Sequence, residues 1–195
     1  MFPLFQIPER QLFIGNILII ACCGFYLAWW LVTFRTSGAA AGMKTGWLLI
    51  PAVIAGLAGV ILAIRSMGLL ERVPGRQLFS SGYVLWGGLA AYLILLAITV
   101  LLLKRPPTSE LLLIVGWGVL ALTEINALYG CGLFSHKLSA GLLVVICAAL
   151  AVALVCYIIY YRLDGLAGYI DGMVPLLLTI IVMAAIVCFM AAPGK

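Results

Sequence analysis

The stretch "LSAGLLVVICAALAVALVCYIIYY", Leu138 to Tyr161, contains no charged residue and decides the fold class of the chain. A helix crosses hydrocarbon about 30 Å thick with about 20 consecutive apolar residues. This stretch is therefore long enough to span a lipid bilayer. Because backbone N–H and C=O groups cannot stay unpaired in lipid, and the stretch is too long and too uniformly apolar for a barrel strand, it predicts a transmembrane helix.

Five further stretches share this length and composition. Of the 195 residues, 66% are hydrophobic and 9% are charged, whereas soluble domains are about 45–50% apolar. We predict an all-α integral membrane protein with six transmembrane helices in a single membrane domain, residues 1–195. The helices are expected at residues 12–33, 46–67, 82–103, 111–132, 138–161 and 170–191.

Charge and the first residues bear on location and partners. "MFPLFQIPERQLF" lacks the basic segment and small-residue cleavage site of a signal peptide, so we expect the first helix to remain in the mature protein. The net charge of +5 is spread over the loops without a basic stripe, which predicts contact with a lipid bilayer and not with nucleic acid. Basic residues divide almost evenly between the two sides, with a bias that favours cytoplasmic termini in a bacterial cell membrane.

The cysteines and the histidine show no metal or catalytic motif. All six cysteines lie in or beside apolar runs without a C-x-x-C pair, which favours packing. His136 is the only histidine and excludes a bis-histidine haem within one chain. The chain has neither a zinc motif H-E-x-x-H nor a glycine-rich phosphate loop followed by lysine. We expect no enzyme activity, no catalytic residue, no metal and no cofactor.

Small residues predict a packing seam on the second helix. Pairs four residues apart let another backbone approach closely, either within the chain or across a dimer. These residues are Ala52, Ala55, Gly56, Gly59 and Ala63.

A short repeat raises the question of duplicated halves. "PERQLF" from Pro8 recurs as "PGRQLF" from Pro74. Duplication is common in carriers, but an arginine before an apolar run is also ordinary interfacial chemistry. Both interpretations stay open.

The fourth helix carries two polar residues in "TEINALYGCGLFSHKL" from Thr123. An exposed charge at the centre of a bilayer costs about 2.5–3.5 kcal/mol on insertion scales, so Glu124 is expected to face protein or water. At 100° per residue Asn126 points about 200° away from Glu124, which places this helix centrally. Glu124 is either a titrating or ligand-contacting group or a structural hydrogen-bonded carboxyl, and Asn126 is expected to join helices.

The last helix and two tryptophans complete the candidates. Pro175 is expected in the first turn of the last helix, where a missing N–H costs least, and Asp171 at the headgroup level. Trp86 and Trp117 lie deep in their apolar runs, where they either stack on a flat ligand or pack against other helices.

Three segments resemble the translocator protein family, also called tryptophan-rich sensory proteins or TspO/MBR. In "TEINALYGCGLFSHKLSAGLL" Asn126 stands at the family's asparagine and Tyr129 where tryptophan is usual. "YYRLDGLAGYIDGMVPLLL" resembles the family's motif through Tyr169 and Pro175, with two extra residues between them. "ERVPGRQLFSSGYVLWGGLAAYL" is similar to the first loop and second helix, with Trp86 at a comparable place.

The resemblance implies that residues 46–191 form the family's five helices and that the first helix is an addition. It implies a pocket that binds porphyrins, sterols or other flat apolar molecules, and a homodimer. Most of the family's pocket tryptophans are replaced here, and Leu176 stands where tyrosine is usual, which argues against tight porphyrin binding.

The sequence therefore predicts a membrane receptor or carrier that binds a hydrophobic or flat small molecule within the bundle. The alternatives are a small proton-coupled secondary transporter that uses Glu124, and a structural subunit of a membrane complex. The predicted ligand-binding residues are Trp86, Trp117, Glu124, Asn126, Tyr129, Tyr169 and Pro175.

Overall fold

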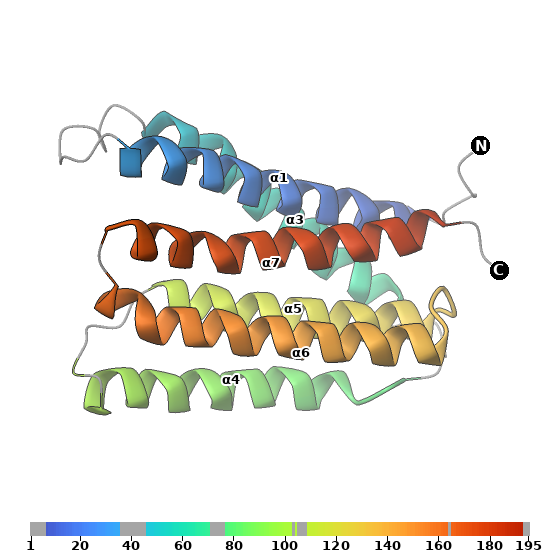
Figure 1. Ribbon diagram of the computed structural model, residues 1–195. Helices are drawn as coiled ribbons and strands as arrows, with labels where there is room; N and C mark the ends of the chain where they lie inside the picture. Colours follow the sequence, from blue (N-terminus) through green and yellow to red (C-terminus); the bar gives the residue numbers. More distant parts are fainter. Residues whose placement is uncertain are drawn as a thin grey trace. The chain divides into compact units, whose positions relative to one another are not determined.

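The protein is all-α in its computed structural model, which describes residues 7–35, 46–70, 77–102, 104, 109–163 and 165–192 (Figure 1). Six helices in this part are long and apolar enough to cross a membrane, which confirms the predicted fold class and identifies an integral membrane protein. The elements are α1 (Ile7–Arg35), η1 (Gly46–Leu48), α3 (Leu49–Leu70), α4 (Ser81–Ala97), η2 (Ile98–Leu102), α5 (Ser109–Gly130), α6 (His136–Ile159), η3 (Tyr160–Arg162) and α7 (Gly165–Ala191).

The observed helices overlap the predicted ones, and α1 and α7 each start five residues earlier than predicted. Helix α1 begins at Ile7 and includes Pro8 and Glu9. Proline is tolerated in a first turn, where its missing N–H would have no helical partner, and an acidic side chain there favours the helix dipole. The apolar run therefore understates the length of this helix.

Helix α7 begins at Gly165, so the expectation for Pro175 is wrong. The proline lies inside the helix, ten residues after its first residue, and not in the first turn. The Thr179 hydroxyl donates to the Pro175 carbonyl oxygen over 3.0 Å. Asp171 also lies inside α7 and is 7% exposed, whereas the sequence predicted it among headgroups. Gly165, Gly168 and Gly172 lie within the first part of α7 and do not delay its start.

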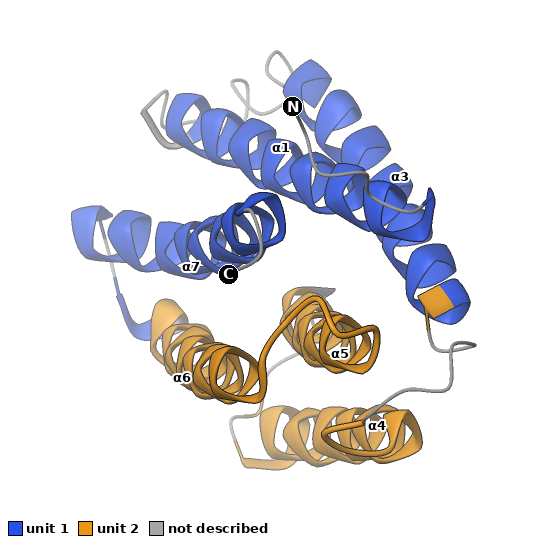
Figure 2. Cartoon of the chain, turned by 90° about the vertical axis from the view of Figure 1, so that its right-hand side faces the viewer, with its two compact units in different colours: residues 1–69, 162–195 blue, residues 70–161 orange. Residues whose placement is uncertain are grey.

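The chain divides into two compact units, each of which is described by itself (Figure 2). Unit 1 comprises residues 1–69 and 162–195, with α1, α3 and α7. Unit 2 comprises residues 70–161, with α4, α5 and α6. Unit 1 therefore joins the two ends of the sequence.

In unit 1, α1 and α3 pack antiparallel through glycine. A Cβ added at Gly15 would lie 3.0 Å from the carbonyl oxygen of Gly59 and 3.2 Å from the nitrogen of Ala63. Further along, a Cβ added at Gly56 would lie 2.9 Å from the sulfur of Cys22. The seam predicted from small residues is confirmed, and it lies within the chain.

The other neighbour of α1 in unit 1 is α7. The indole Nε1 of Trp30 donates to the carbonyl oxygen of Tyr169 over 3.2 Å. The same ring lies 2.8 Å from where a Cβ of Gly172 would be, so this glycine makes room for the tryptophan. The end of α1 is thus fixed against the start of α7.

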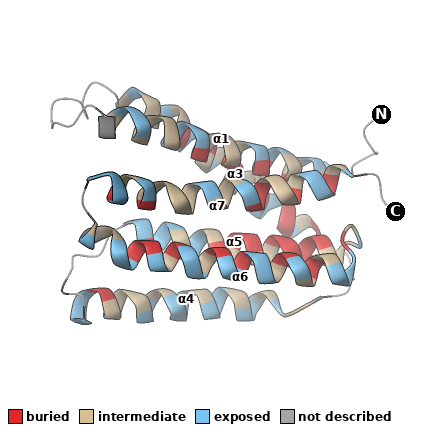
Figure 3. Cartoon of the chain, in the orientation of Figure 1, coloured by how far each residue is buried: buried red, intermediate tan, exposed pale blue. Residues whose placement is uncertain are grey.

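In unit 2, α5 contacts both α4 and α6. Gly118 faces Leu150 of α6 and Tyr129 meets His136, so α6 runs antiparallel to α5. Gly88 of α4 faces Val119 and Phe79 bonds Asn126, so α4 also runs antiparallel to α5. Figure 3 shows buried residues concentrated on α5 and α6 and nearly absent from α4. The prediction of a central fourth helix agrees with α5 being the most buried of the six spans.

A tight turn joins α5 to α6. Gly132 has φ of +82°, a conformation that costs glycine little. The Phe134 N–H donates to the Leu128 carbonyl oxygen over 3.1 Å, and the Phe134 side chain is 3% exposed. The Ser135 side chain accepts from the Leu138 N–H and begins α6.

The two copies of the short repeat differ in structure. Residues 8–13 are helical in α1, whereas Gln77–Phe79 precede α4 outside any helix. Pro74–Arg76 lie outside the described residues. The shared letters therefore do not mark the same local structure.

Candidate functional site

Glu124 is fully buried on the most buried helix of the protein. Its residue exposure is 0%, which confirms the expectation that this carboxyl avoids lipid. Desolvating a carboxylate is expensive, and ionisable groups inside a membrane protein are commonly found on substrate or proton pathways. The position of Glu124 inside the protein is therefore compatible with both a structural and a functional role.

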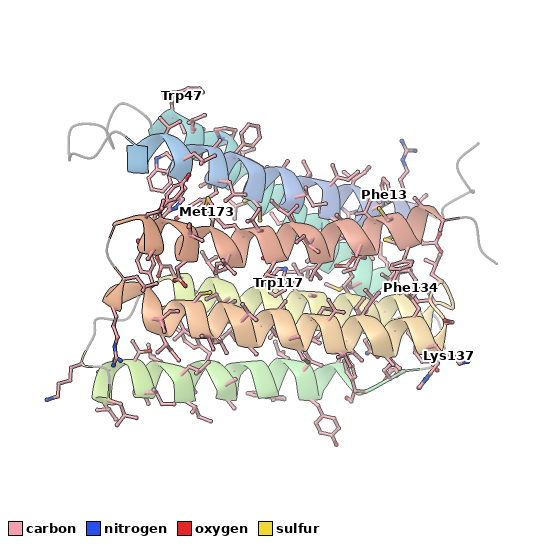
Figure 4. All side chains as sticks on the ribbon, in the orientation of Figure 1. Phe13, Trp47, Trp117, Phe134, Lys137 and Met173 are labelled. Atoms are coloured by element: carbon pink, nitrogen blue, oxygen red, sulfur yellow. The ribbon has the colours of Figure 1, made fainter. Side chains whose placement is uncertain are left out.

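Trp117 shares a face of α5 with Glu124. The two residues are seven apart, which corresponds to about two helical turns and about 10 Å along the axis. The indole Nε1 of Trp117 is buried and has no hydrogen-bond partner among the described residues. Figure 4 shows this side chain near the middle of α5, away from the two ends of the helix. This face therefore combines a buried donor with a buried acid.

Asn126 lies on another side of α5 and is 2% exposed. Its Oδ1 accepts from the Leu78 N–H over 2.9 Å and from the Phe79 N–H over 3.4 Å. Its Nδ2 donates to the Phe79 carbonyl oxygen over 3.0 Å and lies 3.5 Å from the hydroxyl of Ser81. Asn126 thus joins α5 to the first residue of α4, as the sequence predicted, and its shorter bonds go to the segment that precedes α4.

Tyr129 lies near the end of α5, where its ring meets the ring of His136 edge-on at 5.9 Å between centroids. Gly130 and the turn follow directly, so Tyr129 marks the boundary of the helical hairpin. The only histidine of the chain is exposed at the start of α6. The contact joins the two ends of the α5–α6 turn.

Trp86 is 69% exposed on α4. It is therefore not part of the buried surface that Trp117 and Glu124 share. An exposed tryptophan on a membrane helix commonly contacts the interface region of the bilayer. The exposure does not support packing of Trp86 between helices within unit 2, and stacking on a ligand stays a prediction.

Tyr169 and Pro175 belong to unit 1, whereas the other five predicted site residues belong to unit 2. The backbone of Tyr169 is fixed by Trp30. Pro175 is half-buried inside α7. The predicted set therefore divides into a group on α4 and α5 and a second group on α7.

The sequence analysis did not name four buried polar residues, Asn16, Ser66, Thr99 and Ser139, and it did not expect Asp171 to be buried. Asn16 and Ser139 are 0% exposed, and Asp171 is 7% exposed. Ser139 Oγ and Asp171 Oδ2 have no hydrogen-bond partner within the described ranges. The signal available in the sequence was the presence of a polar residue within an apolar run.

Among the described residues no group of three or more His, Cys, Asp or Glu side chains is arranged to hold a metal ion. The chain matches no protein-family model, no curated protein and no solved structure.

Proposed function

We propose that the protein is a membrane receptor or carrier for a small apolar molecule, which binds on the face of α5 that carries Trp117 and Glu124. The observation that carries this proposal is the buried indole N–H of Trp117, which has no partner in the described part of the chain. A buried donor without a partner costs about 1–3 kcal/mol. An oxygen of a bound ligand would remove that cost.

The ligand class follows from the surroundings. The neighbours of Trp117 on α5 are aliphatic residues and glycine, so an apolar ligand body fits, and one oxygen acceptor would give it its orientation. The resemblance to the translocator protein family supports a flat molecule such as a porphyrin or a sterol. The same resemblance supports a homodimer, and the charge bias supports cytoplasmic termini in a bacterial membrane.

The test removes the indole N–H of Trp117 and keeps an aromatic ring at this position. We expect protoporphyrin IX or cholesterol to raise the melting temperature of the purified protein, because a ligand that binds only the folded state stabilises it. Trp117→Phe should weaken binding about five- to tenfold, since a neutral hydrogen bond contributes about 1 kcal/mol. Trp47→Phe is the matched control, because Trp47 is 65% exposed at the start of the second span (Figure 4). Equal binding by both variants would refute a contact at Trp117.

A second candidate function rests on Glu124, whose residue is 0% exposed. A carboxyl inside a membrane protein is suited to take up and release a proton during transport. If Glu124 carries the proton, Glu124→Gln abolishes the uptake of protoporphyrin IX into liposomes that a pH gradient drives. Glu110→Gln is the control, because Glu110 is exposed at the start of α5.

The two experiments also separate the third interpretation, a structural subunit. Ligand stabilisation without gradient-driven uptake supports a receptor, and uptake that depends on Glu124 supports a proton-coupled carrier. If neither porphyrin nor sterol binds and no uptake occurs, the structural role gains support and the receptor proposal fails.

A further inference from the structure

Helix α4 packs against α5 in unit 2 through side chains that remain partly exposed. None of the residues Ser81–Ala97 is buried. Helices in a bilayer are held together by close packing and hydrogen bonds, because the lipid tails are as apolar as the side chains. Gly88 meets Val119 in a close approach of α4 to α5. Because α4 has no buried side chain along its length, the contacts at its two ends contribute to its position.

At the first end, the side chain of Asn126 on α5 bonds the segment that leads into α4. Asn126 pairs with both the N–H and the C=O of Phe79, two residues before α4 begins. Ser80, the residue before the helix, makes no capping hydrogen bond with its side chain. Asn126 thus replaces the local cap that would otherwise fix the start of α4.

The second end has a different geometry. Residues Ile98–Leu102 form a π-helical turn, a wider arrangement that is often found at functional sites. The hydroxyl of Thr99 donates to the Leu95 carbonyl oxygen over 2.8 Å and lies 3.5 Å from the hydroxyl of Tyr157 on α6. The strong bond of Thr99 is thus within its own helix, and the bond to α6 is long.

We propose that α4 is a hinged helix. Asn126 is the latch at its first end, and the π-helical turn is the pivot at its second end. Release of the latch swings the first half of α4 away from α5 and uncovers the side of α5 that carries Val119 and Asn126. This side differs from the face of Trp117 and Glu124, so the hinge does not depend on the proposed ligand.

The test measures distances between spin labels in the full chain, with the six native cysteines replaced by alanine. Labels on α4 are each paired with an exposed position of α6 at the same level. In Asn126→Ala we expect the distance distribution to broaden most at the start of α4, less in the middle and not at the π-helical turn. The three label pairs are Tyr83→Cys with Lys137→Cys, Leu89→Cys with Val145→Cys, and Leu101→Cys with Val155→Cys.

Thr123→Ala is the matched control, because the Thr123 hydroxyl donates to the Val119 carbonyl oxygen of its own helix. It should leave all three distributions unchanged. Broadening at Tyr83 alone would show local fraying of the helix start and would overturn the hinge. Equal broadening at all three levels, or none, would also overturn it.

A second measurement covers the case in which Asn126→Ala does not fold. Asn126→Asp keeps the acceptor for Leu78 and Phe79 and loses the donor to the Phe79 carbonyl oxygen. A Cβ at Gly88 would lie 3.7 Å from the Cβ of Val119, within the range of about 3.5–4.5 Å found in disulfides. Oxidation of a Gly88→Cys, Val119→Cys pair should therefore be fast, and Asn126→Asp should slow it several-fold. An unchanged rate would contradict the hinge.

Discussion

The contact between α1 and α3 in unit 1 and the contact between α4 and α5 in unit 2 are built differently. In the first, glycines bring two backbones together, so a Cβ at Gly59 would lie 2.8 Å from the Gly15 carbonyl oxygen. In the second, one amide side chain holds a peptide segment outside the helix. The comparison shows two ways to associate helices without a hydrophobic driving force, one by packing and one by hydrogen bonds.

The largest expected effect comes from breaking the packed contact. Gly59→Val places atoms against the Gly15 carbonyl oxygen and the Ile19 backbone nitrogen, which cannot rotate away as a side chain can. We expect a loss of about 3 kcal/mol in the free energy of unfolding, at the upper end for overpacked cores. The measurement is unfolding of the purified protein in mixed micelles with increasing SDS.

The matched control for Gly59→Val is Gly68→Ala on the same helix. No atom lies within 4 Å of a Cβ added at Gly68, and alanine favours a helix over glycine by about 0.5–1 kcal/mol. Gly68→Ala should therefore be neutral or stabilising. If both variants have the same stability, the two helices do not pack through this seam.

The sequence made the packed contact predictable and the hydrogen-bonded contact only in part. Small residues four apart on the second apolar run predicted a seam, because their spacing repeats on one helix face. Asn126 was recognised as a polar residue needing a partner, but its partner is the backbone of Phe79, and backbone groups carry no sequence signal. The sequence could therefore predict the need for a bond and not the element that meets it.

The residues of the candidate site were also predictable from the sequence only in part. The burial of Glu124 follows from the cost of a charge in lipid, and the structure confirms it. The exposure of Trp86 depends on which face α4 turns outward, and a helix that is apolar on all sides does not encode that choice. The start of α7 was predicted too late because Pro175 was expected in a first turn, whereas the helix begins ten residues earlier and continues through the proline.

Breaking the hydrogen-bonded contact should have an intermediate effect. Asn126→Ala removes the partner of both backbone groups of Phe79. We expect a loss of about 1–2 kcal/mol, because single hydrogen bonds between membrane helices average about 0.6 kcal/mol and several are lost together. The same unfolding measurement applies, with Thr123→Ala as the control. Equal stability of the two variants would mean that the hydrogen bonds between Asn126 and Phe79 do not stabilise the folded state.

The smallest effect is expected where α4 meets α6. Tyr157→Phe removes the hydroxyl that lies 3.5 Å from Thr99 Oγ1, while Thr99 keeps its 2.8 Å bond to the Leu95 carbonyl oxygen. We expect a change below about 0.6 kcal/mol, the average for such bonds, because this one is long. Tyr83→Phe, at a position that is 79% exposed, gives the baseline for losing a tyrosine hydroxyl. A loss at Tyr157 as large as that at Asn126 would mean that the long bond to Thr99 stabilises the protein as much as the contacts of Asn126 do.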